Sequence, residues 1–335
     1  MIITKTPLRV SLVGGGTDLP EFYSQYGGAV VSFAIDKYIY VMLNKKFDGG
    51  VRVSYSVTEN VNEPEMLKHD LVRVALTRFK EVENKSTNVE IVSIADIPGG
   101  GTGLGSSSSF TVGLLLALNK YYGHPTNRHP ADLANNAYFL ERELCDHPVG
   151  KQDHFAAAYG GFNFFYFHND GLVTTIPINL SKANLGMMQH NMMLFWVGKT
   201  RHSDTILKDQ ARGLRDDPLV YEDAMAMKNL AVGLNEYLQK DNIATIGTYI
   251  GLNWQLKKNQ ALGIAPKEIR NYYDAAMEAG ASGGKLCGAG GSGFLLFYAP
   301  YEYHAAIEKA VGLRLVPFKI SDEGAQVIYD DGGRA

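Results

Sequence analysis

The feature that most limits the fold of this chain is the position of its glycines. They occur in short clusters between stretches that have the pattern of regular secondary structure. Thirty-six glycines occur among 335 residues, with clusters at residues 14–16, 99–105 and 288–293. Glycine adopts positive φ readily and lets a backbone approach a ligand without a Cβ in between. The clusters therefore predict tight, ligand-holding loops in a folded protein, and they argue against a flexible linker.

Composition and charge exclude several classes of protein. Hydrophobic residues make up 45% and charged residues 20% of the chain, which is ordinary for a soluble globular protein. A net charge of −3 provides no broad basic surface for nucleic acid. Cys145 and Cys287 are the only cysteines and form no CxxC and no Cys/His cluster of metal-ligand spacing, which excludes a disulfide framework and a structural zinc site. No stretch has the length of a membrane helix or the pattern of a signal peptide, so we expect a cytoplasmic protein with no membrane and no nucleic-acid partner.

Strand and helix patterns alternate along the chain, with no linker rich enough to separate two independent bodies. We expect strands over residues 30–45, 52–57, 88–95, 161–168, 172–178, 191–198, 294–298 and 314–319 and around residue 285. We expect helices over residues 110–122, 131–144, 203–213, 220–239, 242–262, 266–279 and 301–311. The expected boundary lies near residues 180–190, which gives an N-terminal domain of residues 1–185 and a C-terminal domain of residues 186–335.

The second glycine cluster has the pattern of a phosphate-binding loop. Residues 98–109 read PGGGTGLGSSSS and precede an apolar helical run. Such a loop presents free N–H groups and the positive end of a helix dipole to a phosphate, and its serine hydroxyls can cap the helix or bind magnesium. The chain has no G-x-x-x-x-G-K-[ST] loop. Residues 288–293 match G-x-G-x-x-G but lead into a strand, which argues against a dinucleotide site.

Three separated motifs together resemble the GHMP kinases, the family of galactokinase, homoserine kinase, mevalonate kinase and phosphomevalonate kinase. They are PLRVSLVGGGTD at residues 7–18, PGGGTGLGSSS at residues 98–108 and GKLCGAGGSGF at residues 284–294. They occur in the order of the family, so the resemblance spans essentially the whole chain. It implies an α+β fold with an N-terminal domain like ribosomal protein S5 domain 2, a ferredoxin-like C-terminal domain, and ATP and substrate in the cleft between them.

The resemblance also implies roles for individual residues. Asp153 matches the catalytic carboxylate and Arg9 the basic residue beside it, while Ser107 and Glu141 match the ligands of Mg²⁺. Glu143 and Asp146 compete with Glu141 and Asp153 for these assignments; a helix cap is the alternative role for Ser107, and a surface charge is the alternative for Arg9. The residues implied for ATP binding are Gly100, Gly101, Gly103, Leu104, Gly105, Ser106, Ser107 and Ser108.

Within the family, residues 12–18 (LVGGGTD) are most similar to the branch that contains D-glycero-D-manno-heptose 7-phosphate kinases and fucose-type kinases. Gly15 and Gly16 stand where galactokinases carry Glu and His, which leaves space in the site. Asp18 would accept hydrogen bonds from sugar hydroxyls, or else cap a turn or helix. Arg201, in the basic turn 199–202, would bind a phosphate on the substrate, with a solvated surface loop as the alternative. The implied substrate-binding residues are Gly15, Gly16, Thr17, Asp18, Arg201, Gly288, Gly290 and Gly291.

The activity implied by the resemblance is ATP-dependent phosphorylation of the anomeric hydroxyl of a heptose 7-phosphate. ATP and Mg²⁺ would be the cofactors. The partners would be small molecules, and the protein could form a homodimer. Another sugar 1-kinase, for example one acting on fucose, and a non-catalytic sugar sensor are the alternatives. Retention of Asp153, Glu141 and Ser107 favours a catalyst over a sensor. The sugar-type motif argues against the decarboxylase of the family's diphosphomevalonate branch.

Overall fold

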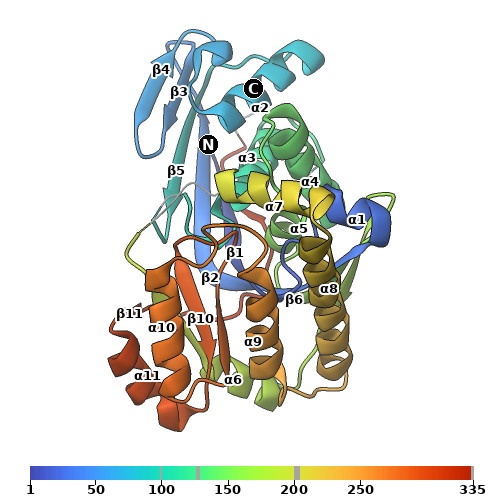
Figure 1. Ribbon diagram of the computed structural model, residues 1–335. Coiled ribbons are helices and arrows are strands. Elements are labelled where there is room, and N and C mark those ends of the chain that lie inside the picture. The colour runs from blue at the N-terminus through green and yellow to red at the C-terminus, as the bar shows by residue number, and fades with distance from the viewer. Residues whose placement is uncertain (99, 126–128, 200–203, 333–335) are drawn as a thin grey trace.

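The computed structural model describes residues 1–98, 100–125, 129–199 and 204–332, which form two sheets flanked by helices (Figure 1). The first sheet contains β1 (Ile2–Val13), β2 (Gly28–Lys45), β3 (Val51–Ser54), β4 (Thr58–Val61), β5 (Val89–Ala95), β6 (Phe162–Phe167), β7 (Val173–Pro177) and β12 (Gln326–Asp330). Its order is β12–β1–β2–β5–β3–β4, and the hairpin β6–β7 adds to the first part of β2. The long strand β2 thereby joins every part of this sheet.

Helices of the N-terminal half cover this sheet. They are α1 (Pro20–Tyr26), α2 (Asp70–Glu83), α3 (Ser106–Tyr121), α4 (Pro130–Tyr138) and α5 (Gln152–Tyr159). The apolar helix α3 packs on β1 and β2 and also contacts α4 and α5. A single helix was expected over residues 131–144, but α4 ends at Tyr138 and a π-helical turn follows over Phe139–Leu144. Such turns often occur at functional sites, and this one carries Glu141.

The second sheet is antiparallel and has the order β11–β8–β10–β9. Its strands are β8 (Met192–Trp196), β9 (Gly283–Leu286), β10 (Phe294–Tyr298) and β11 (Arg314–Leu315). The helices of this half are α6 (Lys182–His190), α7 (Asp204–Asp216), α8 (Pro218–Leu238), α9 (Ile246–Lys257), α10 (Lys267–Glu278) and α11 (His304–Val311). In the described residues, none of the helices has the length and hydropathy needed to cross a membrane.

One hydrophobic core extends from the first sheet to one face of the second sheet. Side chains alternate between the two faces of a strand, and both faces of β8 are buried. Met192 and Leu194 join the core that contains the first sheet, whereas Met193 and Phe195 join a second core under α10 and α11. The apolar run expected to form a buried strand therefore does so, because the second sheet lies between two apolar layers.

Two expected elements are shorter in the structure because the residues at their ends form hydrogen bonds with other segments. The helix expected over residues 242–262 is α9, and the chain leaves it after Lys257 so that the carbonyl of Ile264 accepts a hydrogen bond from the Gly291 amide. The strand expected over residues 314–319 pairs only at Arg314 and Leu315. Beyond them the chain crosses to the first sheet, where the Lys319 carbonyl accepts a hydrogen bond from the Asp36 amide.

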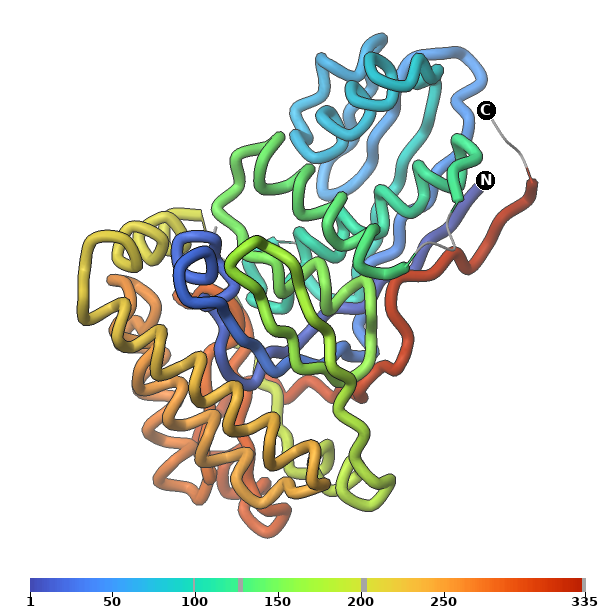
Figure 2. Tube along the Cα trace, turned by 90° about the vertical axis from the view of Figure 1, so that its right-hand side faces the viewer, coloured from blue at the N-terminus to red at the C-terminus, as the bar shows by residue number. Residues whose placement is uncertain are grey.

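The C-terminal segment departs from the expected division at residues 185 and 186. Strand β12 pairs with β1 in the first sheet, so residues 326–330 belong structurally to the N-terminal body. Figure 2 shows this segment running back along the molecule toward the N-terminus. Its five residues end a loop-rich stretch without a strong strand pattern, and their pairing depends on the free edge of β1 rather than on local sequence.

Candidate active site

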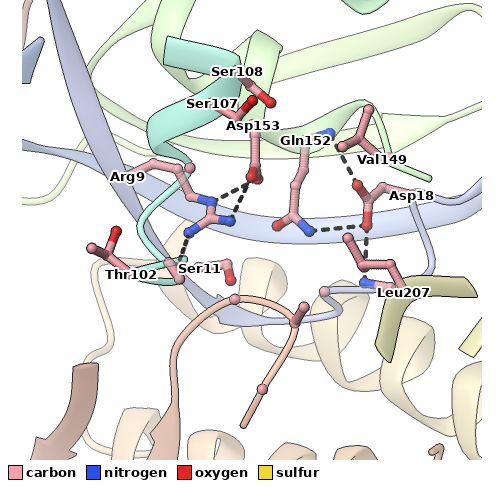
Figure 3. A pocket seen from close by; sticks show the side chains of 18 of the residues that line it. Arg9, Ser11, Asp18, Thr102, Ser107, Ser108, Val149, Gln152, Asp153 and Leu207 are labelled. Carbon is pink, nitrogen blue, oxygen red and sulfur yellow. Dashed lines mark hydrogen bonds and ion pairs between the residues drawn. The ribbon is translucent and has the colours of Figure 1, made fainter. Parts of the chain in front are cut away.

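A cavity of about 120 Å³ lies where the two halves of the molecule meet. Its walls come from β1, from the loops that precede α1, α3 and α5, from α7 and α9, and from the loop between β9 and β10 (Figure 3). All three glycine clusters reach this cavity. The lining residues implied by the resemblance are Arg9, Gly15, Gly16, Asp18, Gly101, Gly103, Gly105, Ser106, Ser107, Ser108, Asp153, Gly288 and Gly290.

Arg9 and Asp153 form a two-pronged ion pair at the cavity wall (Figure 3). Arg9 Nε and Nη2 donate to the two carboxylate oxygens of Asp153, each over 2.7 Å, and Arg9 Nη1 donates to the Gly103 carbonyl over 2.6 Å. Paired N–H groups fix the orientation of a carboxylate as well as attracting its charge. The Arg9 side chain is 4% exposed and that of Asp153 is 22% exposed, so the arginine is a buried support and the carboxylate faces the cavity.

The sequence left open whether Arg9 is a surface charge and whether Asp146 takes the role of Asp153, and this pair answers both questions. Arg9 lies inside β1 and is buried, so it is not a surface charge at a strand end. Asp146 is exposed and lies beside an outer pocket with His147 and Arg212. Asp153, in the first turn of α5, is therefore the carboxylate that the fold places with Arg9.

Ser107 and Glu141 lie together behind the start of α3. Ser107 Oγ donates to Glu141 Oε1 over 2.5 Å, and Thr111 Oγ1 donates to Oε2 over 3.4 Å. His154 Nε2 lies 2.8 Å from Oε2, and His147 Nδ1 lies 3.8 Å from Oε1. The helix is capped by Gly105 without a side-chain hydrogen bond, so Ser107 does not act as the helix cap.

Glu141 is a buried carboxylate whose surroundings favour its charged form. Complete burial by itself raises the pKa of Glu141, but the nearby His147, hydrogen bonds from His154 and Ser107, and the charge of His154 hold that pKa well below its usual range. Glu143, its competitor in the sequence, is exposed. An ionised carboxylate beside a serine hydroxyl is an oxygen donor set that suits Mg²⁺, which takes its remaining ligands from phosphates and water. The residues present therefore fit this metal, although the described part of the chain holds no cluster of three or more His, Cys, Asp or Glu side chains arranged for an ion.

Asp18 joins the first glycine cluster to the start of α5 (Figure 3). Its Oδ1 accepts from the Gly16 amide over 2.9 Å and from Gln152 Nε2 over 3.0 Å, and its Oδ2 accepts from the Gln152 amide over 3.1 Å. Burial, and then the charge of Asp153, raise the pKa of Asp18. Asp18 therefore closes a turn with Gly16, which was one alternative to sugar binding, but it does not cap α1, whose N-cap is Leu19. It also lines the cavity and keeps a lone pair for a further donor.

Several expected site residues lie elsewhere. The Thr17 hydroxyl bonds to the carbonyls of Gly14 and Ala29 at 2.9 and 3.0 Å, so Thr17 holds its loop to β2 instead of lining the cavity. Leu104 is fully buried in the core, and its carbonyl accepts from the Arg9 amide. Expected residues outside the lining are Gly100, Leu104, Thr17, Glu141 and Gly291. Arg201 lies outside the described residues, as do residues 200, 202 and 203 around it, whereas Lys199 of the same turn forms an ion pair with Glu268 at 3.1 Å.

The structure adds lining residues that the sequence did not reveal. Lys257 and Lys285 reach the cavity from α9 and β9, and Gln152 and Gln210 reach it from α5 and α7. Lys285 lies within the third motif, where a charged residue in an otherwise apolar strand is a signal that could have been used. Lys257 gives no such signal, because Lys258 follows it and only the fold shows which of the two is buried.

Comparison with known proteins matches both halves of the chain. The family model described as GHMP kinases N terminal domain matches residues 70–161, and the GHMP kinases C terminal model matches residues 234–311. The D-glycero-alpha-D-manno-heptose 7-phosphate kinase of Campylobacter jejuni is 29% identical over 97% of this chain and 98% of its own. The L-fucokinase/L-fucose-1-P guanylyltransferase of Bacteroides fragilis is 24% identical over 96% of this chain and 38% of its own.

Solved structures agree with these matches. A putative sugar kinase from Campylobacter jejuni superposes with a TM-score of 0.77 at 28% identity, covering 97% of each chain. A D-glycero-D-manno-heptose 1-phosphate kinase from Bacteriodes thetaiotaomicron gives a TM-score of 0.79 at 24% identity, covering 98% of this chain and 100% of its own. The expected two-domain α+β architecture is thereby confirmed. The chain belongs to the GHMP kinase family.

Proposed function

We propose that this protein is an ATP-dependent kinase that phosphorylates the anomeric hydroxyl of D-glycero-α-D-manno-heptose 7-phosphate to give the 1,7-bisphosphate, a precursor for nucleotide-linked heptose. The observation that carries the kinase assignment is the Arg9–Asp153 pair, which lies in one cavity between the glycine loop before α3 and Asp18. The Campylobacter jejuni relative and the space beside Gly15 and Gly16 support the heptose phosphate.

In this proposal Asp153 aligns the acceptor. Phosphoryl transfer requires an in-line hydroxyl and neutralisation of charge more than covalent help from the protein. Asp153 accepts a hydrogen bond from the anomeric hydroxyl and takes its proton as the new O–P bond forms and the bond to ADP breaks. Arg9 fixes the carboxylate through two hydrogen bonds, and Asp18 holds another hydroxyl of the sugar.

The nucleotide would lie against the glycine loop before α3, on the other side of Asp153. The backbone at Gly101, Gly103 and Gly105 and the start of α3 bind its phosphates. Ser107 and Glu141 would hold Mg²⁺, whose bound charge neutralises the phosphate oxygens. We place the reaction in the cytoplasm, where ATP is available. That the protein forms a homodimer stays a prediction.

A panel of sugars and sugar phosphates, with ADP release as the readout, tests this function. The highest kcat/KM is expected with heptose 7-phosphate, and ³¹P NMR should show a new anomeric phosphate. Preference for an unphosphorylated sugar would favour the second candidate, a fucose-type 1-kinase, which the Bacteroides fragilis relative supports. Binding of sugar without ADP release would favour a sensor.

Arg201 enters the same proposal as a ligand for the phosphate at C7. Arg201→Ala removes a charge-assisted hydrogen bond, so affinity for heptose 7-phosphate should fall roughly 10- to 150-fold. The KM should rise more than kcat falls, because this phosphate is remote from the reacting hydroxyl. An equal effect on an unphosphorylated heptose would remove Arg201 from this role.

A further inference from the structure

Lys257 and Lys285 are two buried ammonium groups in the wall of the cavity. Lys257 is 5% exposed and Lys285 is 3% exposed, yet both line the cavity. Within the described residues, neither Nζ forms an ion pair with a carboxylate. Buried charges in proteins are normally paired, because their removal from water is costly. Two such groups in one cavity therefore require an explanation that the kinase chemistry at Asp153 does not supply.

Lys257 keeps a donor free for a ligand. Its Nζ donates to the Gly15 carbonyl over 3.2 Å and to Gln210 Oε1 over 2.9 Å. An ammonium group has three N–H donors, so one is left over. A Cβ on Gly16 would lie 2.2 Å from Gln210 Nε2 and 3.0 Å from this Nζ, so the glycine allows both side chains to approach the loop. The ammonium lies at the Gly15–Gly16 side of the cavity.

Lys285 approaches the same region from β9. Its Nζ donates to the Ser11 carbonyl over 2.9 Å, with Ser11 Oγ and the Leu12 carbonyl at 3.5 Å. These neutral partners orient the ammonium without neutralising it. The two lysines are held by consecutive parts of the first motif, β1 and the glycine loop, and both line the same cavity.

The electrostatics of the empty cavity disfavour these charges. Burial, and then the charge of Lys285, lower the pKa of Lys257 to about 7, against a smaller opposing attraction from Asp18. Burial lowers the pKa of Lys285 to about 8, and Arg9 acts in the same direction while Cys287 opposes it. An anion between the two ammonium groups would relieve the desolvation and the repulsion together.

We propose that Lys257, supported by Lys285, binds the phosphate group that the substrate already carries. The inference rests on the proposed function, in that the acceptor is a sugar phosphate, and it adds the residues that select for that phosphate. A dianionic phosphate supplies both the charge and the acceptor oxygens that the two lysines lack. An unphosphorylated sugar would leave them unpaired, which makes the subsite a determinant of specificity.

Lys257→Met tests the subsite, because methionine keeps most of the side-chain volume and removes the charge. Calorimetry should show affinity for heptose 7-phosphate falling roughly 10- to 150-fold, with affinities for ATP and for unphosphorylated heptose nearly unchanged. Lys258→Met is the matched control, since Lys258 is on the next position of the chain, is more exposed and does not line the cavity. The control should bind all three ligands as the wild type does.

A second measurement uses the wild type and does not depend on the variant folding. At pH 8 much of Lys257 is neutral in the empty protein, so binding of a dianion should draw a proton from solution. Calorimetry in Tris and in HEPES, whose ionisation enthalpies differ, should show proton uptake with heptose 7-phosphate and none with heptose. Lys257→Met should reduce this uptake, which separates Lys257 from Asp18, Arg9 and Cys287.

The outcomes separate this inference from the proposed function. If the wild type phosphorylates only unphosphorylated sugars, the proposed function fails and the subsite fails with it. If the wild type prefers heptose 7-phosphate but Lys257→Met binds it equally well and no proton is taken up, only the subsite is overturned. If Lys257→Met instead lost affinity for ATP, the lysines would belong to the nucleotide site, and the proposed phosphate subsite would also be overturned.

Discussion

Gly103 and Gly288 lie backbone against backbone, so that a Cβ on either residue would enter the other loop. A Cβ on Gly103 would fall 2.3 Å from the Cys287 carbonyl oxygen, and one on Gly288 would fall 2.4 Å from Gly103 Cα. One loop leads into α3 of the N-terminal half, and the other joins β9 to β10. The two glycines therefore fix the position of the loop before α3 against the C-terminal sheet.

Gly288→Ala should weaken ATP binding by separating these loops. The added Cβ meets backbone atoms that cannot rotate away, and the residue has a φ of +71° that disfavours alanine. Gly312→Ala is the matched control, because Gly312 has a φ of +64° with no atom within 4 Å of the Cβ position. We expect at least a 10-fold rise in the Kd for ATP, measured by calorimetry, only in Gly288→Ala. If both variants lost similar affinity for ATP, the effect would come from backbone strain and not from the contact between the loops.

Asp153→Asn should lower kcat by about 10²-fold or more while ATP still binds, the scale expected for loss of a general base. The amide retains the size of the carboxylate but cannot accept hydrogen bonds from Arg9 at both of its polar atoms. Pre-steady-state measurement of ADP formation and equilibrium ATP titration separate the two effects. Turnover near the wild-type rate would exclude Asp153 from the chemical step.

Ser107→Ala should raise the Mg²⁺ concentration needed for half-maximal activity and lower kcat. The substitution removes the hydroxyl that lies 2.5 Å from Glu141 Oε1, leaving one of the two oxygen groups proposed for the ion. Ser106→Ala is the control from the same helical turn, because Ser106 is not among the contacts of Glu141. Magnesium titrations of both variants should differ; identical curves would argue against the assignment of Ser107.

His147 should make the stability of the fold depend on pH in the alkaline range. Its hydrogen bond to Asp70, at 2.7 Å, and its proximity to Glu141 raise the pKa of His147 to about 10 from an unfolded value near 6.5. A raised pKa stabilises the fold fully below pH ~6.5, and that stabilisation is lost as the pH rises through about 10.

The variant His147→Gln isolates this contribution. Urea unfolding at pH 6.5 and pH 10.5 should show the difference in unfolding free energy between wild type and variant shrinking by about 1 kcal/mol, the scale of a partly exposed ion pair. A difference that is constant across this range would mean that His147 does not titrate with the fold.

Much of the fold follows from patterns that are local in the sequence. The apolar strand at residues 192–196 and the hairpin of β6 and β7 follow from periodicity and from the turn at residues 169–171. The π-helical turn at Glu141 could not be predicted in this way, because it depends on packing between α4, α3 and α2. The same holds for β12, whose pairing partner β1 lies at the other end of the chain.

The site was accessible from the sequence only where a motif marks it. Arg9, Ser107 and Asp153 lie in or beside recognisable motifs, and the fold brings them to one cavity. The burial of Lys257 depends on the side of α9 that faces the glycine loop, which is a tertiary relationship. Thr17 is the opposite case. It belongs to the motif, but its hydroxyl donates to the Ala29 carbonyl and holds the loop to β2 instead of lining the cavity.

The return of β12 to the edge of β1 has a consequence for synthesis on the ribosome. Residues 2–5 of β1 pair on one side with β2 and on the other with residues 326–330, so a growing chain carries that edge unpaired until β12 has been made. Unpaired strand edges are templates for association with other chains. The edge of β1 in the nascent N-terminal half therefore stays exposed until β12 emerges, and a fragment that ends before residue 326 would keep this edge exposed.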